Sequence, residues 1–415
     1  MFSRRLMTSA LRSLALVVCA TLWPGNAQAE DKPLVLWHAY RVQERAALEK
    51  TVDAWNTGGR GAHPKIKLLA VPYDAFADKI TAATPRGHGP DLFIFAHDRV
   101  GDWAESKIIE PIEFWMTEKH ADTFILKTID ALCYGDSLYG LPMAFKSTLL
   151  FYNKKLVPEP PHTTDDLWRV GQQLTDRKAG RYGLVYDNAK LYFHAPWLHG
   201  FGGMIFDERG KLHISSKAAV AAMNFARKIS GPTGIVPPES TSTLTTTLFA
   251  HGKVAMAISG PWMVGELKKD LEVGAIPLPI VSSTGKRAAP FMGAEGIMMS
   301  AKSKRKADGF AAMKFLTSDK MALLRAKAAR QPVANKAAWL DPTVKADALL
   351  SAFYAQLKFA KVMLGTPEMR LVWSPYDMAL QKVVVGGGPA APALAEAQHE
   401  VQRFLESSRK GKVQP

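Results

Sequence analysis

Short apolar runs alternate with longer segments of mixed polarity along the first hundred residues of the chain. The runs Leu34–Trp37, Ile66–Val71 and Leu92–Ala96 have the length and composition of β-strands. Between them, residues 43–55 and 76–83 repeat apolar side chains at helical spacing, which predicts two helices. The order strand, helix, strand, helix, strand is typical of α/β proteins.

A second set of alternating elements follows the hairpin-like segment 135–142. The predicted elements are a strand at Leu149–Tyr152, helices at 164–175, 217–230 and 243–250, strands at Val254–Ile258 and 273–280, a glycine-rich crossing segment at Pro290–Met299, and a last helix at 393–405. Prolines at positions 158, 160 and 161 follow the strand at Leu149–Tyr152 and lead into the helix at 164–175, and we expect the chain to change domain in this region. The 415-residue chain is also long for one domain, so we expect two.

The strand Leu92–Ala96 ends abruptly in charged residues. Its continuous hydrophobicity predicts a strand covered on both faces, and Asp98 and Arg99 follow at its carboxyl end. In open α/β sheets, ligands bind at the carboxyl ends of strands. Asp98 and Arg99 are therefore candidate ligand-binding residues. The alternative is that they only pair with each other or cap the next helix.

The amino-terminal segment has the pattern of a secretory signal peptide. Three arginines in the first twelve residues precede an apolar core at Leu14–Leu22, and Ala27-Gln-Ala29 matches a cleavage site. The core is shorter than the ~20 residues of a membrane-spanning helix. Val18 stands where a lipid-attachment signal at Cys19 needs a small residue. We expect residues 1–29 to be removed and a soluble protein to be exported to the periplasm.

Cleavage after Ala29 leaves Cys133 as the single cysteine, which excludes an internal disulfide. Its neighbours Ala131, Leu132 and Tyr134 predict that Cys133 is a small buried residue. With 47% hydrophobic residues, the chain has enough apolar side chains to be stabilised by a core alone.

The chain is strongly basic, but its charge pattern does not indicate nucleic-acid binding. The formal charge of +15 falls to +12 once three arginines and no acids are removed with the signal peptide. The remaining lysines and arginines are scattered, apart from small clusters at 302–306 and 409–412. His194 and His199 are five residues apart, a poor spacing for a metal site on one helix face. We expect no nucleic-acid partner, metal or other cofactor.

Three groups of motifs occur in a characteristic order along the chain. They are Gly89-Pro-Asp with Ala96-His-Asp-Arg99, Tyr139-Gly-Leu-Pro142 with Phe151-Tyr-Asn-Lys154, and Phe249-Ala-His-Gly-Lys-Val-Ala-Met256 with Ser259-Gly-Pro-Trp262. With these motifs behind a signal peptide, the chain resembles the maltose/maltodextrin-binding proteins from about Leu34 to Phe404. That family comprises the extracytoplasmic solute-binding proteins of bacterial ABC sugar importers.

The resemblance implies an α/β fold of two lobes, with mixed sheets flanked by helices and crossing hinge segments between the lobes. One lobe would comprise residues 30–143 and 295–340, and the other 149–290 and 345–415. The lobes would close around a carbohydrate held between them and present it to the permease subunits of an ABC transporter. The protein would be a monomer without enzymatic activity, and would meet the membrane only through the permease.

The resemblance also assigns candidate ligand-binding residues. Asp98 and Arg99 match the acid and base that bind sugar hydroxyls, and Phe95 lies where the family often has a tryptophan. The matched stacking aromatics of the opposite lobe are Tyr192, Trp262 and Trp373. Sugars require this combination, because their hydroxyls donate and accept hydrogen bonds while their C–H faces pack on aromatic rings.

Three cations depart from the family pattern. Arg41, followed by Val42, replaces an Asp-Lys pair, and Lys146 and Lys190 each replace a glutamate. These cations could hold the anionic group of a sugar acid or sugar phosphate. Alternatively, they pair with nearby acids or face solvent, and the ligand is a neutral oligosaccharide. We favour the neutral ligand, because surface lysines are normally solvated.

Two other functional classes remain open. A glycoside-acting enzyme needs two carboxylates across the scissile bond, but Asp98, Glu295 and Asp377 show no recognisable catalytic pairing. Motifs of serine hydrolases, zinc peptidases and P-loop proteins are missing from the sequence. A receptor that reports sugar to a sensor would have the same sequence features as a transport protein.

Overall fold

The apolar runs gather into two main sheets in the computed structural model, which describes residues 32–58, 63–268 and 270–412. The first sheet contains six strands: β1 (Leu34–His38), β2 (Ile66–Ala70), β3 (Leu92–Ala96), β6 (Gly140–Lys146), β11 (Phe291–Met299) and β12 (Lys361–Val362). Their order is β12-β11-β3-β1-β2, and β6 also pairs with β11. β1 runs parallel to β2 and β3, whereas β11 runs antiparallel to β3 and β6. The sheet is therefore mixed.

The second sheet has the order β10-β7-β9-β8. Its strands are β7 (Leu149–Asn153), β8 (Tyr182–Val185), β9 (Val254–Ser259) and β10 (Val273–Ile276). β8 and β9 are parallel and the other pairs are antiparallel. A separate ribbon pairs β4 (Cys133–Tyr134) with β5 (Ser137–Leu138).

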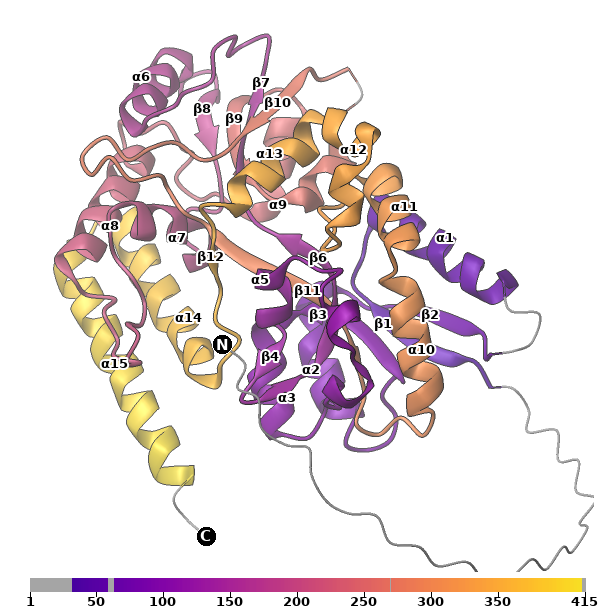
Figure 1. Cartoon of the computed structure of the whole chain (residues 1–415). Coiled ribbons are helices and arrows are strands. Elements are labelled where there is room, and N and C mark those ends of the chain that lie inside the picture. Colours follow the sequence, from indigo (N-terminus) through magenta and orange to yellow (C-terminus); the bar gives the residue numbers. More distant parts are fainter. Residues whose placement is uncertain (1–31, 59–62, 269, 413–415) are drawn as a thin grey trace, which may run out of the picture. The chain divides into compact units, whose positions relative to one another are not determined.

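Helices flank both sheets (Figure 1). The α-helices are α1 (Val42–Gly58), α2 (Tyr73–Ala83), α3 (Val100–Glu105), α4 (Glu118–Ala121), α5 (Leu126–Asp130), α6 (Thr164–Leu174), α7 (Leu191–Gly200), α8 (Lys217–Ser230), α9 (Ser242–Ala250), α10 (Lys306–Leu316), α11 (Asp319–Ala329), α12 (Pro342–Ala346), α13 (Ala348–Leu357), α14 (Pro367–Leu380) and α15 (Ala390–Lys412). α1 packs on α10 and α11, while α6, α9 and α13 contact strands of the second sheet. α14 packs against α7 and α15, and α15 also contacts α8. No helix in the described ranges has the length and apolar content needed to cross a bilayer.

Local sequence explains where α6 begins and how it packs. The Thr163 hydroxyl accepts the Asp166 backbone N–H at 3.1 Å, and the Asp166 carboxylate accepts the Thr163 N–H at 3.3 Å. This capping box satisfies N–H groups at the helix start. On the inner face, a Cβ on Gly183 would collide with the backbone of Gly171. The two glycines therefore let α6 lie directly on β8.

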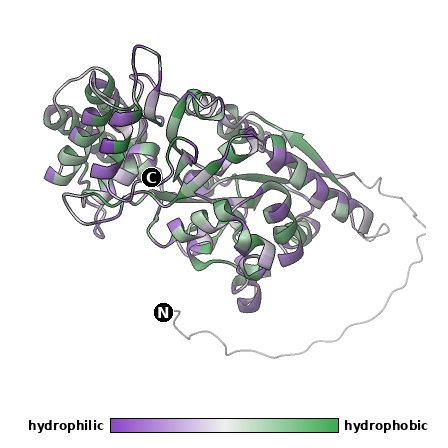
Figure 2. Ribbon diagram, turned by 90° about the horizontal axis from the view of Figure 1, so that it is seen from above, coloured by the Kyte–Doolittle hydropathy of each residue, from purple (hydrophilic) through white to green (hydrophobic). Residues whose placement is uncertain are grey.

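The core is continuous from the first sheet into the second. Leu36 and Phe93 of the first sheet belong to the same buried cluster as Phe151 and Phe249 of the second. Burying each such side chain contributes roughly 1.5–3 kcal/mol. Figure 2 shows the strands as mainly hydrophobic, while the helices carry both hydrophobic and hydrophilic segments.

Two segments that pass between the sheets lie side by side. β6 leads into β7 through Ser147 and Thr148, which are fully buried. The Ser147 hydroxyl donates to the backbone oxygen of Phe291, at the start of β11, at 2.9 Å. This bond fastens the first crossing to the strand that returns from the second sheet.

The predicted element order is confirmed, with some changed boundaries. The segment predicted as strand over 273–280 ends as a strand at Ile276, and the last helix spans Ala390–Lys412 rather than 393–405. Pro290–Met299, predicted as a crossing segment, contains the nine-residue strand β11 in the first sheet. The predicted signal peptide lies outside the described residues.

The prediction that Cys133 is buried is wrong. Cys133 is exposed and free, in the short strand β4. The prediction followed its apolar neighbours, but Ala131 and Leu132 lie in the core while the side chain of the next residue, Cys133, faces outward.

Candidate functional site

His97 fixes the end of β3, where the candidate acid and base are located. Its ring is fully buried, and its Nδ1 accepts the backbone N–H of Ala294 at 3.0 Å while its Nε2 donates to the Met363 oxygen at 2.6 Å. Burial lowers the pKa of His97, which keeps the ring neutral. The buried ring thus anchors the short 3-10 helix His97–Arg99. The other two residues of this helix, Asp98 and Arg99, are only partly buried.

Asp98 and Arg99 are neighbours in sequence, but their side chains do not form a hydrogen bond with each other. Asp98 Oδ2 and Arg99 Nε are 3.6 Å apart, beyond hydrogen-bond distance. Asp98 Oδ1 and Arg99 Nε are buried atoms with no hydrogen-bond partner among the described residues. Burial raises the pKa of the Asp98 carboxyl, although the charge of Arg99 acts in the opposite direction. The arrangement leaves acceptor and donor capacity for another molecule.

Trp262, Tyr192, Phe291 and Trp373 form a chain of neighbouring aromatic rings. The Tyr192 ring centroid is 6.2 Å from that of Trp262 and 6.3 Å from that of Phe291, which in turn is 5.9 Å from Trp373. Phe291 is buried, whereas the other three rings are partly exposed. Side chains from α7, the 3-10 helix Pro261–Glu266 and α14 therefore form one aromatic group.

The Ser-Gly-Pro-Trp motif has a steric explanation. A Cβ on Gly260 would overlap the ring of Trp262, so glycine lets the indole fold back over the end of β9. The Nε1 of Trp262 is buried without a hydrogen-bond partner in the described part of the chain. The indole therefore offers both an apolar face and a donor.

Tyr73 and Asp98 link the acid–base pair to the aromatic group. Burial, and then the charge of Asp98, raises the pKa of Tyr192. The charges of Asp98 and Glu295 also act on Tyr73. Asp98 is therefore within electrostatic range of a tyrosine from α2 and of another from α7.

Phe95 lies beneath this site rather than on its surface. It is 4% exposed, and its ring stacks on Tyr73 at 5.0 Å and on Phe76 at 4.8 Å. Tyr73 is 54% exposed and covers it. The exposed aromatic face on this side therefore belongs to Tyr73, with Phe95 as its support.

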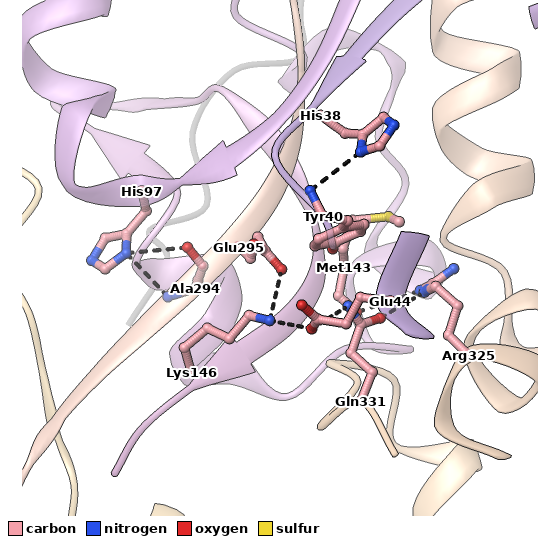
Figure 3. Close-up of polar contacts among 10 residues, drawn as sticks. All are labelled: His38, Tyr40, Glu44, His97, Met143, Lys146, Ala294, Glu295, Arg325 and Gln331. Carbon is pink, nitrogen blue, oxygen red and sulfur yellow. Dashed lines mark hydrogen bonds and ion pairs between the residues drawn. The ribbon is translucent and has the colours of Figure 1, made fainter. Parts of the chain in front are cut away.

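Two of the three unexpected cations are paired with acids. Lys146 contacts Glu44 and Glu295, the latter with 3.4 Å between Nζ and Oε2 (Figure 3). Lys190 donates to Asp377 at 3.0 Å. Arg41 is exposed.

His194 and His199 are both held as neutral rings. His194 is fully buried, and burial lowers its pKa to about 3. Burial likewise lowers the pKa of His199 to about 4, and its Nδ1 donates to the Ala289 oxygen at 2.6 Å. Within the described ranges, no group of three or more histidine, cysteine or acidic residues is arranged to hold a metal ion.

Comparison with known proteins identifies the family. The family model described as bacterial extracellular solute-binding protein matches residues 41–323. The chain belongs to this family.

Several proteins similar to this solute-binding protein are named for the sugars that they bind. It is 25% identical over 365 residues to a maltotriose-binding protein of Pyrococcus abyssi, covering 86% of this chain and 79% of the relative. It is 26% identical to a galactooligosaccharide-binding protein of Bacillus subtilis, with 98% of each chain covered.

Solved structures confirm the expected fold. A maltotriose-binding protein of Thermus thermophilus matches with a TM-score of 0.81 at 24% identity, over 90% of this chain and all of that one. A cyclo/maltodextrin-binding protein complexed with maltotetraose matches with a TM-score of 0.78 at 29% identity, covering 91% and 99%. The solute-binding protein thus has the two-lobed α/β fold, and the resemblance to maltodextrin-binding proteins is confirmed.

Sequence reasoning missed four residues that adjoin the candidate site: Glu44, Tyr73, Phe291 and Glu295. Glu295 carried a signal, because it is the single charged residue in the apolar run Phe291–Met299. An acid inside such a strand requires a partner or a function. Tyr73 lies before the helix predicted at 76–83, whereas α2 already begins at Tyr73.

Proposed function

We propose that this solute-binding protein captures a neutral, maltodextrin-like oligosaccharide and delivers it to an ABC permease. The main support is the set of unpartnered buried atoms beside aromatic rings, namely Asp98 Oδ1, Arg99 Nε and Trp262 Nε1. Buried polar groups normally have partners, so these atoms favour a ligand that donates to the acid and accepts from the two N–H groups. A saccharide does both through its hydroxyls, and its C–H faces pack on Tyr192, Trp262 and Trp373.

The ion pairs favour a neutral ligand over an anionic one. Lys146 is shared by Glu44 and Glu295, and Lys190 is held by Asp377. Such pairing leaves two of the three proposed anion-binding cations already neutralised. Asp98 and Arg99 are adjacent and of opposite charge, so they add no net charge. An anionic sugar would have to compete for these two lysines with carboxylates of the protein itself.

The lobe boundaries in this proposal are residues 30–143 with 295–340, and 149–290 with 345–415. The buried Ser147–Thr148 crossing between β6 and β7 supports the first boundary. Contacts of α13 with β7 and β10 support assigning residues after 345 to the lobe of the second sheet. Closure of the lobes about these crossings would bring the acid–base pair and the aromatic group onto opposite sides of the sugar.

The cellular part of the proposal follows from the family. Its members are extracellular solute-binding proteins, so residues 1–29 would direct export and be removed near Ala29. The mature protein would act as a periplasmic monomer, without catalysis, and would meet the membrane only at the permease.

Ligand titration tests the function directly. Calorimetry would be performed with maltotriose, a galacto-oligosaccharide, a sugar phosphate and an oligosaccharide oxidised to a terminal carboxylate. We expect binding of a neutral oligosaccharide and a higher melting temperature in its presence.

The variant Asp98→Asn should weaken binding by ~10-fold or more, because a charge-assisted acceptor is lost. Tight binding of the anionic sugars alone would overturn the neutral-ligand proposal, and release of shorter saccharides would show an enzyme.

A further inference from the structure

A hollow of about 930 Å³ lies between the end of α7 and β12. Its lining residues fall within three segments: 199–209 at and after the end of α7, 286–291 before and at the start of β11, and 361–369 from β12 into α14. Of the aromatic group, only Phe291 lines the hollow, and Asp98 and Arg99 do not. The hollow is therefore separate from the candidate sugar site, although the two share one ring.

Positive charge prevails in the lining of this hollow. Four cations, Arg209, Lys286, Arg287 and Lys361, line it together with two acids, Asp207 and Glu208. Lys286 and Lys361 are exposed, and neither pairs with an acid in the described ranges. The Asp207 carboxylate already accepts two backbone N–H groups of its own loop, each at 2.9 Å. Unlike Lys146 and Lys190, these two lysines therefore carry charges that no acid balances.

Two of the polar groups in the lining have defined positions. A Cβ on Gly202 would lie 3.3 Å from Lys286 Nζ, so the glycine lets this ammonium approach the end of α7. His199 Nδ1 donates to the Ala289 oxygen at 2.6 Å, which makes Nε2 an acceptor in the neutral ring. The charge of Lys361 acts on this ring, so the two side chains are within electrostatic range. The lining thus offers two ammonium groups and an imidazole acceptor.

Apolar side chains form much of the remaining lining. Met204 and Leu364 both line the hollow, and each is 44% exposed. Exposed apolar area of this kind is unfavourable in water, and a ligand with an apolar body would cover it. A small inorganic anion would leave both side chains in contact with water. The composition of the lining therefore indicates a ligand that is both anionic and apolar.

We propose that this hollow is a second ligand site, which binds an organic anion with an apolar body, such as a medium-chain carboxylate. The carboxylate would pair with Lys286 and Lys361, while the chain would pack on Met204, Leu364 and Phe291. The volume of the hollow is in the range of small-molecule sites, roughly 300–1,000 Å³. A neutral oligosaccharide lacks the charge that this lining selects, so this site does not depend on the proposed sugar function.

Calorimetry with decanoate, below its micelle concentration, tests the charged part of the site. Lys286→Glu combined with Lys361→Glu reverses both unpaired charges. Lys302→Glu combined with Lys304→Glu is the matched control, because it changes the net charge equally at two exposed lysines before α10. We expect the decanoate Kd to rise about 10-fold or more in the first variant and less than about 2-fold in the control. Urea unfolding of each variant checks that the fold is retained.

Two further comparisons test the apolar part and the sign of the charge. Leu364→Ser should raise the decanoate Kd about 3- to 10-fold, because apolar contact is lost. Leu340→Ser is its control, since Leu340 is 69% exposed and does not line the hollow. Acetate lacks the apolar chain, and decyltrimethylammonium has the same chain with the opposite charge. Each should bind at least about 10-fold more weakly than decanoate.

Several results would overturn the second site. They are no binding of decanoate by wild type, equal binding of decyltrimethylammonium, and equal losses of affinity in the two double variants. Maltotriose should not displace decanoate. Displacement would place the anion in the sugar site and disprove a separate one. Failure of wild type to bind any neutral oligosaccharide would overturn the proposed function alone, because decanoate binding is measured without sugar.

Discussion

Lys190 and Asp377 form an ion pair that also caps a helix. Lys190 Nζ lies 3.0 Å from Asp377 Oδ2, while the other carboxylate oxygen accepts the backbone N–H of Leu191 at 2.7 Å. Leu191 is the first residue of α7, and Lys190 provides no side-chain cap of its own. An acid from α14 therefore satisfies the start of the helix that carries Tyr192.

Removing Asp377 should lower the free energy of unfolding, whereas removing the charge of Lys190 should hardly change the affinity for maltotriose. Asp377→Ala leaves the Leu191 N–H without its acceptor and should cost about 1–2 kcal/mol in urea unfolding. Lys190→Met should change maltotriose affinity less than about 2-fold, because its side chain is 57% exposed and the pair is screened. Loss of binding in Lys190→Met would instead indicate that this cation contacts the ligand.

Ionic strength should have little effect on sugar affinity. Because Lys146 and Lys190 are engaged by acids, maltotriose Kd is expected to change less than about 2-fold between about 0.05 M and about 0.5 M sodium chloride. Calorimetry at the two concentrations measures this. Binding of a sugar phosphate with a Kd that rises steeply with salt would instead point to an anion held by those lysines.

The aromatic group should contribute strongly to binding. Trp262→Ala and Trp373→Ala each remove a partly exposed ring beside Tyr192 or Phe291, and each should raise Kd about 10- to 100-fold. Trp168→Ala is the control, since Trp168 is a partly buried indole on α6 with Lys228 over its ring. Equal losses of affinity in all three variants would attribute the effect to general destabilisation.

Tyr73 and Phe95 should separate binding from stability. Tyr73→Ala removes the exposed ring and should weaken maltotriose binding by about 10-fold. Phe95→Leu should cost about 1–2 kcal/mol of unfolding free energy through lost packing, with a smaller effect on Kd. A larger loss of affinity in Phe95→Leu than in Tyr73→Ala would restore Phe95 as the direct stacking residue.

His194 should make the fold sensitive to acid. Burial lowers its pKa to about 3 in the folded protein, against about 6.5 when unfolded. The unfolded chain therefore binds a proton first as pH falls, so stability present above about pH 6.5 is lost toward pH 3. From this residue alone, the loss between about pH 8 and about pH 5 is about 2 kcal/mol.

His194→Met tests this sign. Neither ring nitrogen of His194 has a hydrogen-bond partner in the described part of the chain, so an apolar residue of similar volume leaves no partner unsatisfied. Urea unfolding at both pH values should show a smaller acid loss in the variant than in wild type. Equal losses in the two proteins would contradict the buried, neutral state of His194.

Elements formed by contiguous apolar runs were predictable from sequence, whereas contacts between distant residues were not. The run Leu92–Ala96 gave both a strand and the polar residues at its end. The partners of Lys146, however, come from α1 and β11, far away in sequence. Only the folded sheet, which sets Gly293 opposite Lys146, brings Glu295 to it.

Exposure was the other property that local sequence could not decide. Phe95 and Tyr73 are both aromatic, but β3 is central in its sheet and α2 lies over it, so Phe95 is covered and Tyr73 covers it. Cys133 shows the reverse case, in which an apolar neighbourhood surrounds an exposed side chain. The exposure of a side chain depends on which other element packs against it. The pattern of apolar residues within a single element does not contain this information.

The hydrogen bond from Ser147 to Phe291 connects the segment that carries Lys146 to the aromatic group. Ser147 directly follows Lys146, and the Phe291 ring touches both Tyr192 and Trp373. A twist of one crossing segment would therefore move the surroundings of the Trp373 indole and, through Tyr192, of the Trp262 indole. Because indole emission depends on the polarity around the ring, the protein contains its own optical reporter, and a shift in intrinsic fluorescence would register sugar capture without any attached dye.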